Sequence, residues 1–419
     1  MSTKRYSIRK TPNFWPVDLP IILWYRSQLS AKDEKDIFQI LKNPARICEI
    51  DIDMTSVLLE KCASLLEESF PALECLRLGS EGPANGEALV LPDYFLDSSA
   101  PRLRVVRLQN TIFPSLPRLL STSPNLVSLR LENIPARGIF TAQELAIGLS
   151  PATQLESLKI NIHGAPYHRQ IRPLSEQNGL EPRSVLPALF EFEYEGETLY
   201  LDDFASRIDI PNVEQIEATL VNNYDVCLTY GLYGLLARVE DLGSSCHHAT
   251  HIRFFEETVI FEHHFIRSTT SSPVLFRVRL LNAVFLHDDI SFVRSIFSAF
   301  QFVGIMHKVA RVEIEGFPAP SRWEVEADVD SWLSLFSSIS GVKRLHVVGS
   351  LVSSLVSALV DISAEERTVA KLLPALRDLH LPDEPGYSAD IEPFLAARRS
   401  CGRPLSVHYK GLRLHWHDE

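Results

Sequence analysis

The chain has 419 residues, of which 45% are hydrophobic and 22% charged, so it can bury a large core and lacks the composition of a disordered protein. Its formal net charge is -12. Long-range attraction to nucleic acid or to an anionic membrane therefore has the wrong sign, and we expect neither as a partner.

The first residues predict a tail and a compartment. Residues 1–18 carry Lys4, Arg5, Arg9 and Lys10 with no apolar run behind them, so we expect a basic N-terminal tail and not a secretion signal. The six cysteines include no CxxC pair, which is typical of a reducing compartment. The sequence thus indicates a cytoplasmic or nuclear protein.

From residue 19 onward, the pattern L-x-x-L-x-L recurs, with Ile, Val or an aromatic residue often replacing Leu. Successive copies begin about 30 residues apart, near the spacing of leucine-rich repeats. Clear copies begin at Leu73, Leu126, Leu155 and Leu376, looser ones at Ile47, Leu103, Leu189, Val213, Leu275, Val309 and Val342, and weak ones at Leu19 and Ala249. Many short copies at this spacing indicate one repeated structural unit.

The apolar spacing predicts a strand in each copy and a helix in several of the connections. The last two apolar positions of a copy lie two residues apart, the period of a strand. Helical spacing follows at Leu201, Phe204, Ala205 and Ile208 and again at Trp332, Leu335, Phe336 and Ile339, and Thr141-x-x-Glu144 predicts a helix cap. Such crossovers require parallel strands.

These patterns predict an α/β fold, a leucine-rich-repeat-like solenoid (an irregular horseshoe) with a continuous parallel sheet over residues 19–411. The alternative, a doubly wound domain, should show a Gly-rich first turn, which is absent from the sequence. The array fits worst over 222–265, where 251–255 and 259–265 predict a local hairpin. We expect a polar loop at 164–186 and a C-terminal tail at 412–419.

A search for catalytic motifs finds none. The sequence contains no G-x-S-x-G, Walker loop, G-x-G-x-x-G or H-E-x-x-H. The run from Cys246 to His251 has no matching second half, and His263-His264 point in opposite directions on a strand. We expect no metal, no cofactor and no enzymatic activity. The alternative is an enzyme of unrecognised class whose site is built from loops.

The variable residue between the last two apolar positions of each copy should point away from the core. Because neighbouring parallel strands lie about 4.8 Å apart, these residues should form a ladder across an open, concave face. In chain order they are Arg77, Arg107, Arg130 and Lys159, then Glu193 and Glu217, then Arg253 and Arg279, then Glu313, His346 and His380.

The first eight of these residues are the predicted partner-binding site. Two interpretations remain open for them. The row is a solvated face whose charges are relieved by neighbours such as Glu74, Glu132 and Glu156, or it is a groove for an acidic or phosphorylated protein segment, which arginine binds in bidentate fashion.

Several stretches resemble a known family. They include Phe14-Trp-Pro-Val-Asp-Leu-Pro-Ile-Ile, Phe70-Pro-Ala-Leu, Leu91-Pro-Asp-Tyr-Phe-Leu, Leu373-Pro-Ala-Leu-Arg and Phe394-Leu-Ala-Ala-Arg-Arg. Over almost the whole chain the sequence resembles the divergent F-box proteins with leucine-rich-like repeats of mushroom-forming fungi. That resemblance implies a substrate receptor of a ubiquitin ligase. The F-box that normally precedes the repeats is expected to be absent, because residues 1–13 are too short to hold one.

The sequence thus favours a protein–protein interaction module, the substrate-recognition part of an F-box-type ubiquitin-ligase receptor. Its expected partner is a protein, in one interpretation with an acidic segment. The ligase adaptor is expected to bind only if an F-box is supplied elsewhere. A repeat scaffold unrelated to ubiquitination is a further alternative.

Overall fold

The computed structural model divides into two compact units, Met1–Val213 and Glu214–Glu419. The structure describes residues 20–26, 31–81, 89–98, 100–135, 140–163, 183–221, 248–255, 258–266, 273–281, 309–316, 329–349, 351–363, 369, 371–382 and 390–410. The predicted tails at 1–18 and 412–419, and most of the predicted loop at 164–186, lie outside these ranges.

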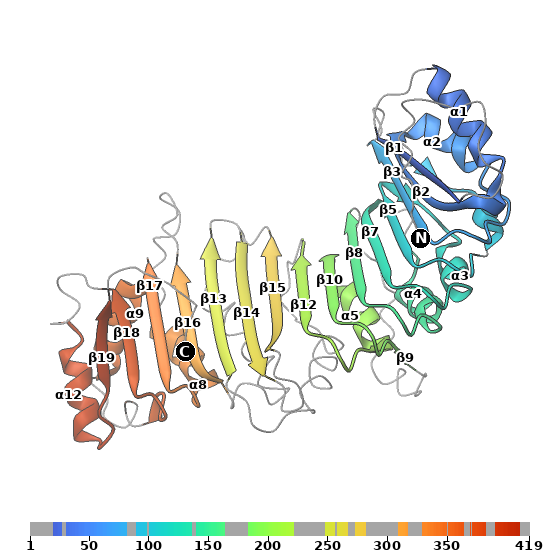
Figure 1. Ribbon diagram of the computed structural model, residues 1–419. Helices are drawn as coiled ribbons and strands as arrows, with labels where there is room; N and C mark the ends of the chain where they lie inside the picture. Colours follow the sequence, from blue (N-terminus) through green and yellow to red (C-terminus); the bar gives the residue numbers. More distant parts are fainter. Residues whose placement is uncertain are drawn as a thin grey trace. The chain divides into compact units, whose positions relative to one another are not determined.

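The first unit is built on a parallel sheet whose strands follow one another in chain order (Figure 1). Each strand pairs in parallel with the next. The strands are β1 (Ile21–Arg26), β2 (Ile47–Thr55), β3 (Cys75–Glu81), β5 (Val105–Gln109), β7 (Ser128–Pro135), β8 (Ser157–His163) and β10 (Glu191–Gly196). The predicted mixed α/β class with a large parallel sheet is confirmed.

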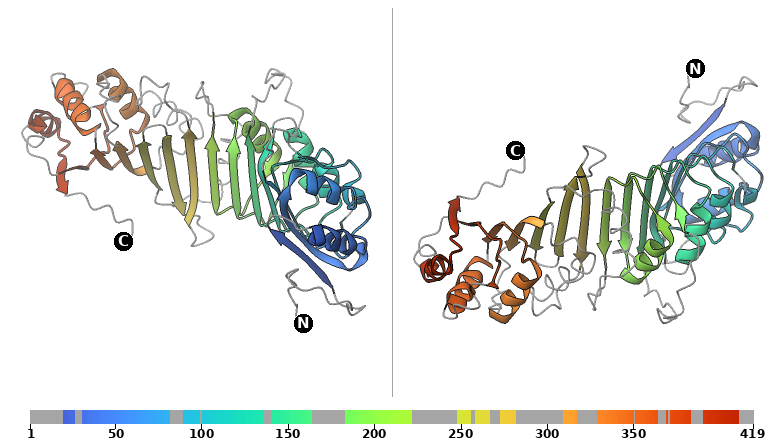
Figure 2. Two further views of the ribbon diagram at one scale, coloured as in Figure 1. Left: turned by 90° about the horizontal axis from the view of Figure 1, so that it is seen from above. Right: turned by 90° about the horizontal axis from the view of Figure 1, so that it is seen from below.

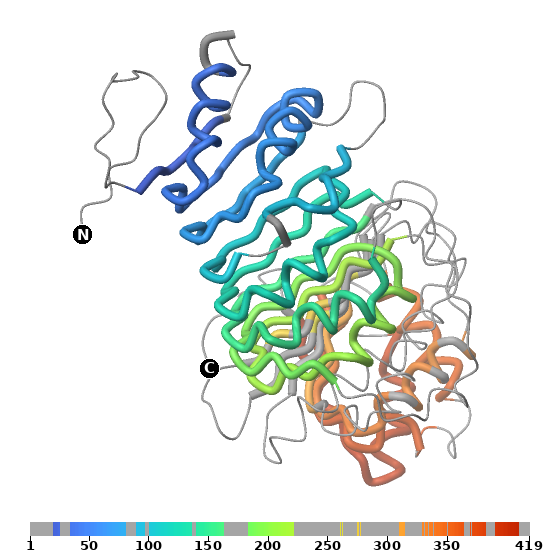
Figure 3. The backbone as a smooth tube through the Cα atoms, turned by 90° about the vertical axis from the view of Figure 1, so that its right-hand side faces the viewer, coloured from blue at the N-terminus to red at the C-terminus, as the bar shows by residue number. Residues whose placement is uncertain are grey.

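Helices and short strands connect the sheet strands of the first unit, and Figure 3 shows the successive turns stacked in chain order. The helices are α1 (Ala31–Leu41), α2 (Ser56–Ala63), α3 (Leu116–Ser121), α4 (Ala142–Leu149) and α5 (Thr198–Arg207), with η1 (Pro44–Arg46) and η2 (Phe95–Ser98) as 3-10 turns. Two small parallel pairs join β4 (Leu89–Val90) to β6 (Thr111–Ile112) and β9 (Ser184–Val185) to β11 (Ile208–Asp209). The cap predicted at Thr141 is confirmed, because its hydroxyl accepts from the Glu144 amide at 3.1 Å.

The same turn leads into several of the strands. In these copies the first apolar residue donates its amide to the carbonyl three residues before it, as Leu103 does to Ala100 and Leu126 does to Ser123. Asparagine side chains join successive turns, since Asn125 donates to the Pro101 carbonyl at 2.9 Å. A recurring turn fixes where each strand starts and so keeps neighbouring strands in register.

The apolar positions of the repeated pattern form the core. Leu76, Leu129, Leu158 and Leu379 are all 0% exposed, which confirms the burial predicted for the central position of each clear copy. The weak copy at Leu19 has the wrong frame. In β1 the residues Ile21, Leu23 and Tyr25 are buried, whereas Trp24, which that frame placed in the core, is 43% exposed.

The second unit also contains a sheet, but its strands do not follow chain order. The order is β12-β15-β14-β13-β16-β17-β18-β19. These strands are β12 (Gln215–Leu220), β13 (His248–Phe255), β14 (Thr258–Ile266), β15 (Pro273–Leu281), β16 (Val309–Gly316), β17 (Arg344–Gly349), β18 (Asp378–Pro382) and β19 (Ser406–Lys410).

Strand β14 is antiparallel to both of its neighbours, β13 and β15. The prediction of a continuous parallel sheet is therefore wrong in this stretch, while the local hairpin predicted there is confirmed. The physical reason is the length of the connections. Only residues 256–257 separate β13 from β14, and 267–272 separate β14 from β15, too few for the crossover that parallel pairing requires.

The described helices of the second unit are α8 (Val329–Ser338), α9 (Leu351–Ser363) and α12 (Glu392–Ser400). They lie against one face of the strands β16 to β19 (Figure 2). The helical spacing predicted around Trp332 is confirmed, since Trp332 and Phe336 are 0% exposed and their rings lie 5.5 Å apart. Helices thus cover one face of the sheet in the first unit and one face of β16 to β19 in the second.

Candidate partner-binding face

The strands of the first unit carry a row of polar residues on the face opposite the helices. In register, Asp51 lies beside Arg77, then Arg107, Arg130, Lys159 and Glu193. We call these six residues the central row, and the face that carries them the open face. The predicted order of Arg77, Arg107, Arg130, Lys159 and Glu193 is confirmed. Their strand neighbours, such as Leu129 and Leu131, are buried on the other side.

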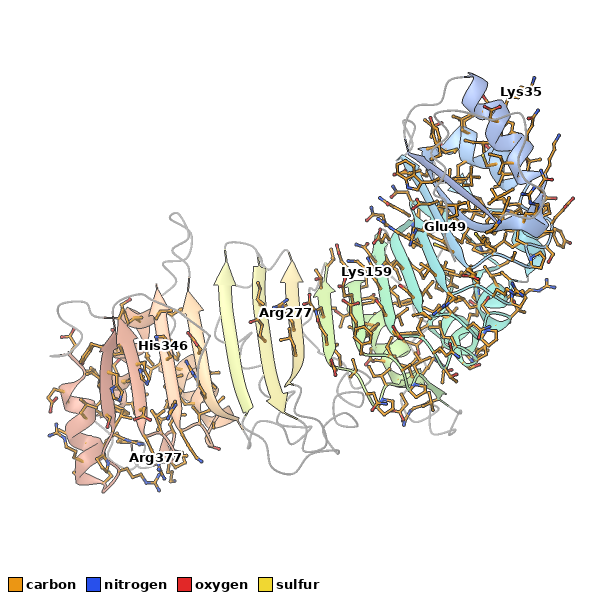
Figure 4. The ribbon with its side chains drawn as sticks, viewed as in Figure 1. Lys35, Glu49, Lys159, Arg277, His346 and Arg377 are labelled. Carbon is orange, nitrogen blue, oxygen red and sulfur yellow. The ribbon has the colours of Figure 1, made fainter. Side chains whose placement is uncertain are left out.

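Arg77 contacts two carboxylates of β2 through one of its guanidinium nitrogens. Its Nη1 lies 2.8 Å from Glu49 Oε1 and 3.3 Å from Asp51 Oδ2, and Figure 4 labels Glu49 on this strand. Partial burial disfavours the charged guanidinium, but Cys75, Asp51 and Glu49 act in the opposite direction and raise the pKa of Arg77. This cation is therefore compensated within the molecule.

Two further cations of the central row are also paired. Arg107 Nη2 lies 2.7 Å from Glu132 Oε2, and Lys159 Nζ lies 2.6 Å from Glu193 Oε2. The four side chains are between 18% and 36% exposed, so each pair contributes little to stability. Their effect on the face is to remove free positive charge.

Arg130 differs from the other three cations. It lies on β7 between Arg107 and Lys159 in the register, and its side chain is exposed. Among the residues that the structure describes, its guanidinium has no hydrogen bond or ion pair. The predicted strip of four free cations is therefore one free arginine between compensated neighbours.

A line of polar bonds joins β8 to β10 at one end of the central row. Ser157 donates to Glu191 at 2.7 Å and Asn161 donates to Glu195 at 2.8 Å, on either side of the Lys159–Glu193 pair. All three glutamates of β10 on the open face thus accept a bond from β8. Satisfied polar ladders of this kind fix strand register.

At the opposite end of the row a buried thiol, Cys75, lies two residues before Arg77 on the same strand. Burial raises the pKa of Cys75 to about 12, and the opposing influence of Arg77 is smaller. In the same unit burial also raises the pKa of Cys62 to about 12. Neither thiol forms the nucleophilic thiolate near neutral pH.

In the second unit the register partner of Glu217 is Arg277, whereas the sequence pattern placed Arg279 in that row. Arg277 lies 2.6 Å from both Glu217 Oε1 and Glu262 Oε1, so two carboxylates compensate it (Figure 4). Arg279 instead pairs in register with Thr219. Arg277, and not Arg279, therefore occupies the position next to Glu217 in the row.

Arg253 also lies two residues away from the position in the row that the sequence pattern gave it. The register partner of Glu313 on β13 is His251, and Arg253 lies opposite Glu315. The reason is that β13 and β15 alternate apolar and polar residues over a longer run than L-x-x-L-x-L. A period of two alone does not distinguish frames that differ by two residues.

The predicted row of Glu313, His346 and His380 is confirmed and continues to His408 on β19. Nδ1 of His346 lies 3.1 Å from Oε1 of Glu313, whose side chain is 0% exposed. The His380 and His408 rings are stacked with centroids 4.7 Å apart. His408 was missed because β19 contains no copy of the pattern, although the alternation in Ser406-Val-His-Tyr signals a strand.

The part of the chain that the structure describes contains neither a metal-binding cluster nor a membrane-spanning helix. No group of three or more His, Cys, Asp or Glu residues there is arranged to hold a metal ion, the histidine row included. No described helix is long and apolar enough to cross a membrane.

Comparison with known proteins adds no assignment, because neither a family model nor a curated protein matches the chain.

Sequence reasoning missed the acidic residues that compensate Arg77. The copy beginning at Ile47 has Asp51 at the same variable position as the cations, and Glu49 lies two residues before it. Reading that copy in the same frame would have placed both carboxylates on the open face. Glu132 was expected as a neighbour of the row, and the structure pairs it with Arg107.

Proposed function

We propose that this protein is a leucine-rich-repeat-like solenoid that binds another protein on the open face of its first unit. The recurring turn and the buried Leu76, Leu129 and Leu158 support the repeat interpretation. Stacked units of this kind expose an extended sheet face, which repeat proteins use for binding.

The observation that carries the proposal is the register of the central row. Six neighbouring strands present one polar side chain each, at the same level, on the face away from the helices. Compensated pairs on both sides of Arg130 give this face a fixed arrangement of charge. Fixed charges on an interface set the orientation and the partner of a complex more than its affinity.

The biological setting that we propose is substrate recognition for a ubiquitin ligase of the F-box type. Its support is the sequence resemblance over Phe70-Pro-Ala-Leu, Leu373-Pro-Ala-Leu-Arg and the related stretches. A module that selects proteins for ubiquitination needs a surface that discriminates between partners. The charge order of the open face provides such a surface.

The experiment is site-directed photo-cross-linking in native cell extract. A photoreactive residue replaces Val105, which lies on the open face, or Arg118, which is exposed on α3. We expect a discrete cross-linked protein at position 105 that excess unlabelled chain competes away, and none at position 118. The same products at both positions would contradict the proposal.

The ligase setting has its own readout in this experiment. The cross-linked complexes are probed for ubiquitin and for the adaptor and cullin of the ligase. A partner whose ubiquitination in the extract rises when the chain is added supports the setting. If a competed partner shows no such rise, the binding function stands and the ubiquitin-ligase setting is contradicted.

A further inference from the structure

The central row contains one cation that the protein leaves available. Arg77 faces two carboxylates, and Arg107 and Lys159 face one each. Arg130 lies between the last two, and its guanidinium has no partner in the described ranges. The open face therefore offers a localised positive charge at the middle of the row, and not an extended basic strip.

The neighbours of Arg130 along β7 define the side from which an anion can approach. Glu132, two residues further on, lies on the same face and is held by Arg107. Ser128, two residues before, lies opposite Ser157 in the register. Its hydroxyl has no hydrogen-bond partner within the described residues. Because Arg107 and Glu132 are bound to each other, that side offers an anion no free donor, whereas the Ser128 hydroxyl offers an additional one.

Charge balance determines what kind of anion fits. One uncompensated guanidinium matches one negative charge, and a carboxylate accepts its two parallel N–H donors. A phosphate carries a charge nearer to two at neutral pH and needs a second free cation. The two nearest cations, Arg107 and Lys159, are already bound to Glu132 and Glu193.

We propose that Arg130, assisted by the hydroxyl of Ser128, binds a single carboxylate from an Asp or Glu side chain of a protein partner docked on the open face. This inference rests on the proposed function, because it assigns the chemistry that the same face recognises. The bound segment carries one required acidic position, and a run of acidic residues gives no further advantage.

The test uses a display library of short randomised peptides selected on the purified chain. Parallel selections use the wild type, Arg130→Glu, Arg130→Gln and the matched control Arg118→Glu, which makes the same charge change on α3. Circular dichroism and thermal unfolding check that each variant is folded. Affinities of the selected peptides are then compared with those of versions in which the acidic residue is replaced by its amide.

We expect the wild type and Arg118→Glu to select peptides with one fixed Asp or Glu. Replacing that residue by its amide, or Arg130 by Gln, should weaken binding about tenfold. Arg130→Glu should select Lys or Arg at the same position, which also shows that the variant surface is intact.

Four outcomes would overturn the inference. They are selected peptides without a fixed acidic residue, an acidic preference that persists in Arg130→Glu, a phosphoserine version that binds the wild type more tightly than the carboxylate, and no selected peptide at all. A competed cross-link at position 105 combined with any of these outcomes would leave the binding function standing. Loss of that cross-link would remove the function as well.

Discussion

Arg107 donates a hydrogen bond to Glu132 at 2.9 Å, although the residue directly opposite Arg107 in the parallel register is Arg130. The pairing is diagonal, from β5 to a position two residues further along β7. It draws the guanidinium of Arg107 toward a carboxylate and away from a like charge. This choice of partner leaves Arg130 as the free cation at the centre of the open face.

A double-mutant cycle measures the Arg107–Glu132 interaction. We expect Arg107→Ala and Glu132→Ala to be coupled by about 0.5 kcal/mol, because both side chains are partly exposed and water screens the pair. The measurement is urea unfolding at low salt and at about 1 M salt, where the coupling should fall. The matched cycle pairs Arg107 with the exposed Glu156 and should show no coupling. Equal coupling in both cycles would contradict the pairing.

Truncation of a central leucine tests the frame assigned to the L-x-x-L-x-L pattern. Leu158 is 0% exposed, so Leu158→Ala should cost about 2–5 kcal/mol from lost transfer energy and the cavity that remains. The control is Leu199→Ala on α5, where the side chain is 45% exposed and the cost should be below about 0.5 kcal/mol. Denaturant unfolding followed by circular dichroism compares the two. A Leu158→Ala cost as small as that of the control would show that the core is assigned wrongly.

The sequence predicts the fold correctly where several local signals agree on one frame. At Leu126-x-x-Leu129-x-Leu131 the turn residue, the strand period and the Pro-Asn lead-in select one frame, and the structure has that frame. At β13 and β15 only the strand period is present. The strand period determines which side chains face inward, but it does not determine the register between neighbouring strands to better than two residues. The predicted row positions of Arg253 and Arg279 were therefore wrong.

The pairing on the open face could not be predicted from one sequence. Register places Arg77, Arg107, Arg130 and Lys159 in a row, and the pattern was sufficient for that. Which carboxylate each cation reaches depends on side-chain rotamers. The diagonal bond from Arg107 to Glu132 and the direct one from Lys159 to Glu193 have different geometries, and no spacing rule distinguishes them.

Gly148 should be intolerant of a side chain. A Cβ atom there would lie 2.7 Å from the carbonyl oxygen of Pro117 and 2.9 Å from its Cα, so α4 would have to move away from α3. Alanine favours a helix over glycine by about 1 kcal/mol, but this gain is smaller than the cost of separating packed backbones. We expect Gly148→Ala to destabilise by about 1–3 kcal/mol in thermal unfolding.

The control for this substitution lies next to it on the same helix. Ile147 is 59% exposed, and Ile147→Ala should be close to neutral. Stabilisation by Gly148→Ala would show that helix propensity outweighs the contact and that the two helices are less closely packed than described.

The buried thiols predict a loss of stability at high pH. Burial raises the pKa of Cys62 and of Cys75 to about 12 from an ordinary value of 9.0. The folded state therefore holds these protons more tightly than the unfolded state. Their contribution is fully present below pH 9 and is lost as pH rises from 9 toward 12. Urea midpoints between pH 8 and 10.5 should fall less steeply in the Cys62→Ala variant than in the wild type.

The reactivity of a partly exposed thiol can be compared with that of a buried thiol in the same chain. Alkylation at pH 8 should modify Cys401, which is partly exposed, before Cys62, which is buried, and mass spectrometry of the digested protein measures the order. Rapid modification of Cys62 in the folded chain would contradict the burial on which the pH dependence rests.

Arg398 is a buried charged residue of the second unit whose replacement should have a large effect. Its side chain is 1% exposed, and its guanidinium donates to the carbonyls of Leu372, Leu373 and Leu376 at 3.0, 3.3 and 2.8 Å. These carbonyls belong to the turn that leads into β18, in which Leu373 has a φ of 42°, a conformation unusual for leucine. Arg398 therefore ties α12 to that turn.

Arg398→Lys should destabilise this region by about 2–4 kcal/mol, because one ammonium cannot replace a planar guanidinium that spans three acceptors. Burial already lowers the pKa of Arg398, and a lysine in the same place loses its proton far more readily. The control is Arg399→Lys, because Arg399 is exposed and its ion pair with Glu392 lies at the surface, so its replacement should cost below about 0.5 kcal/mol. Hydrogen exchange of the β18 and β19 amides reports both variants locally. Faster exchange in Arg398→Lys alone is the expected result, and equal exchange in the two variants would show that the turn does not depend on Arg398.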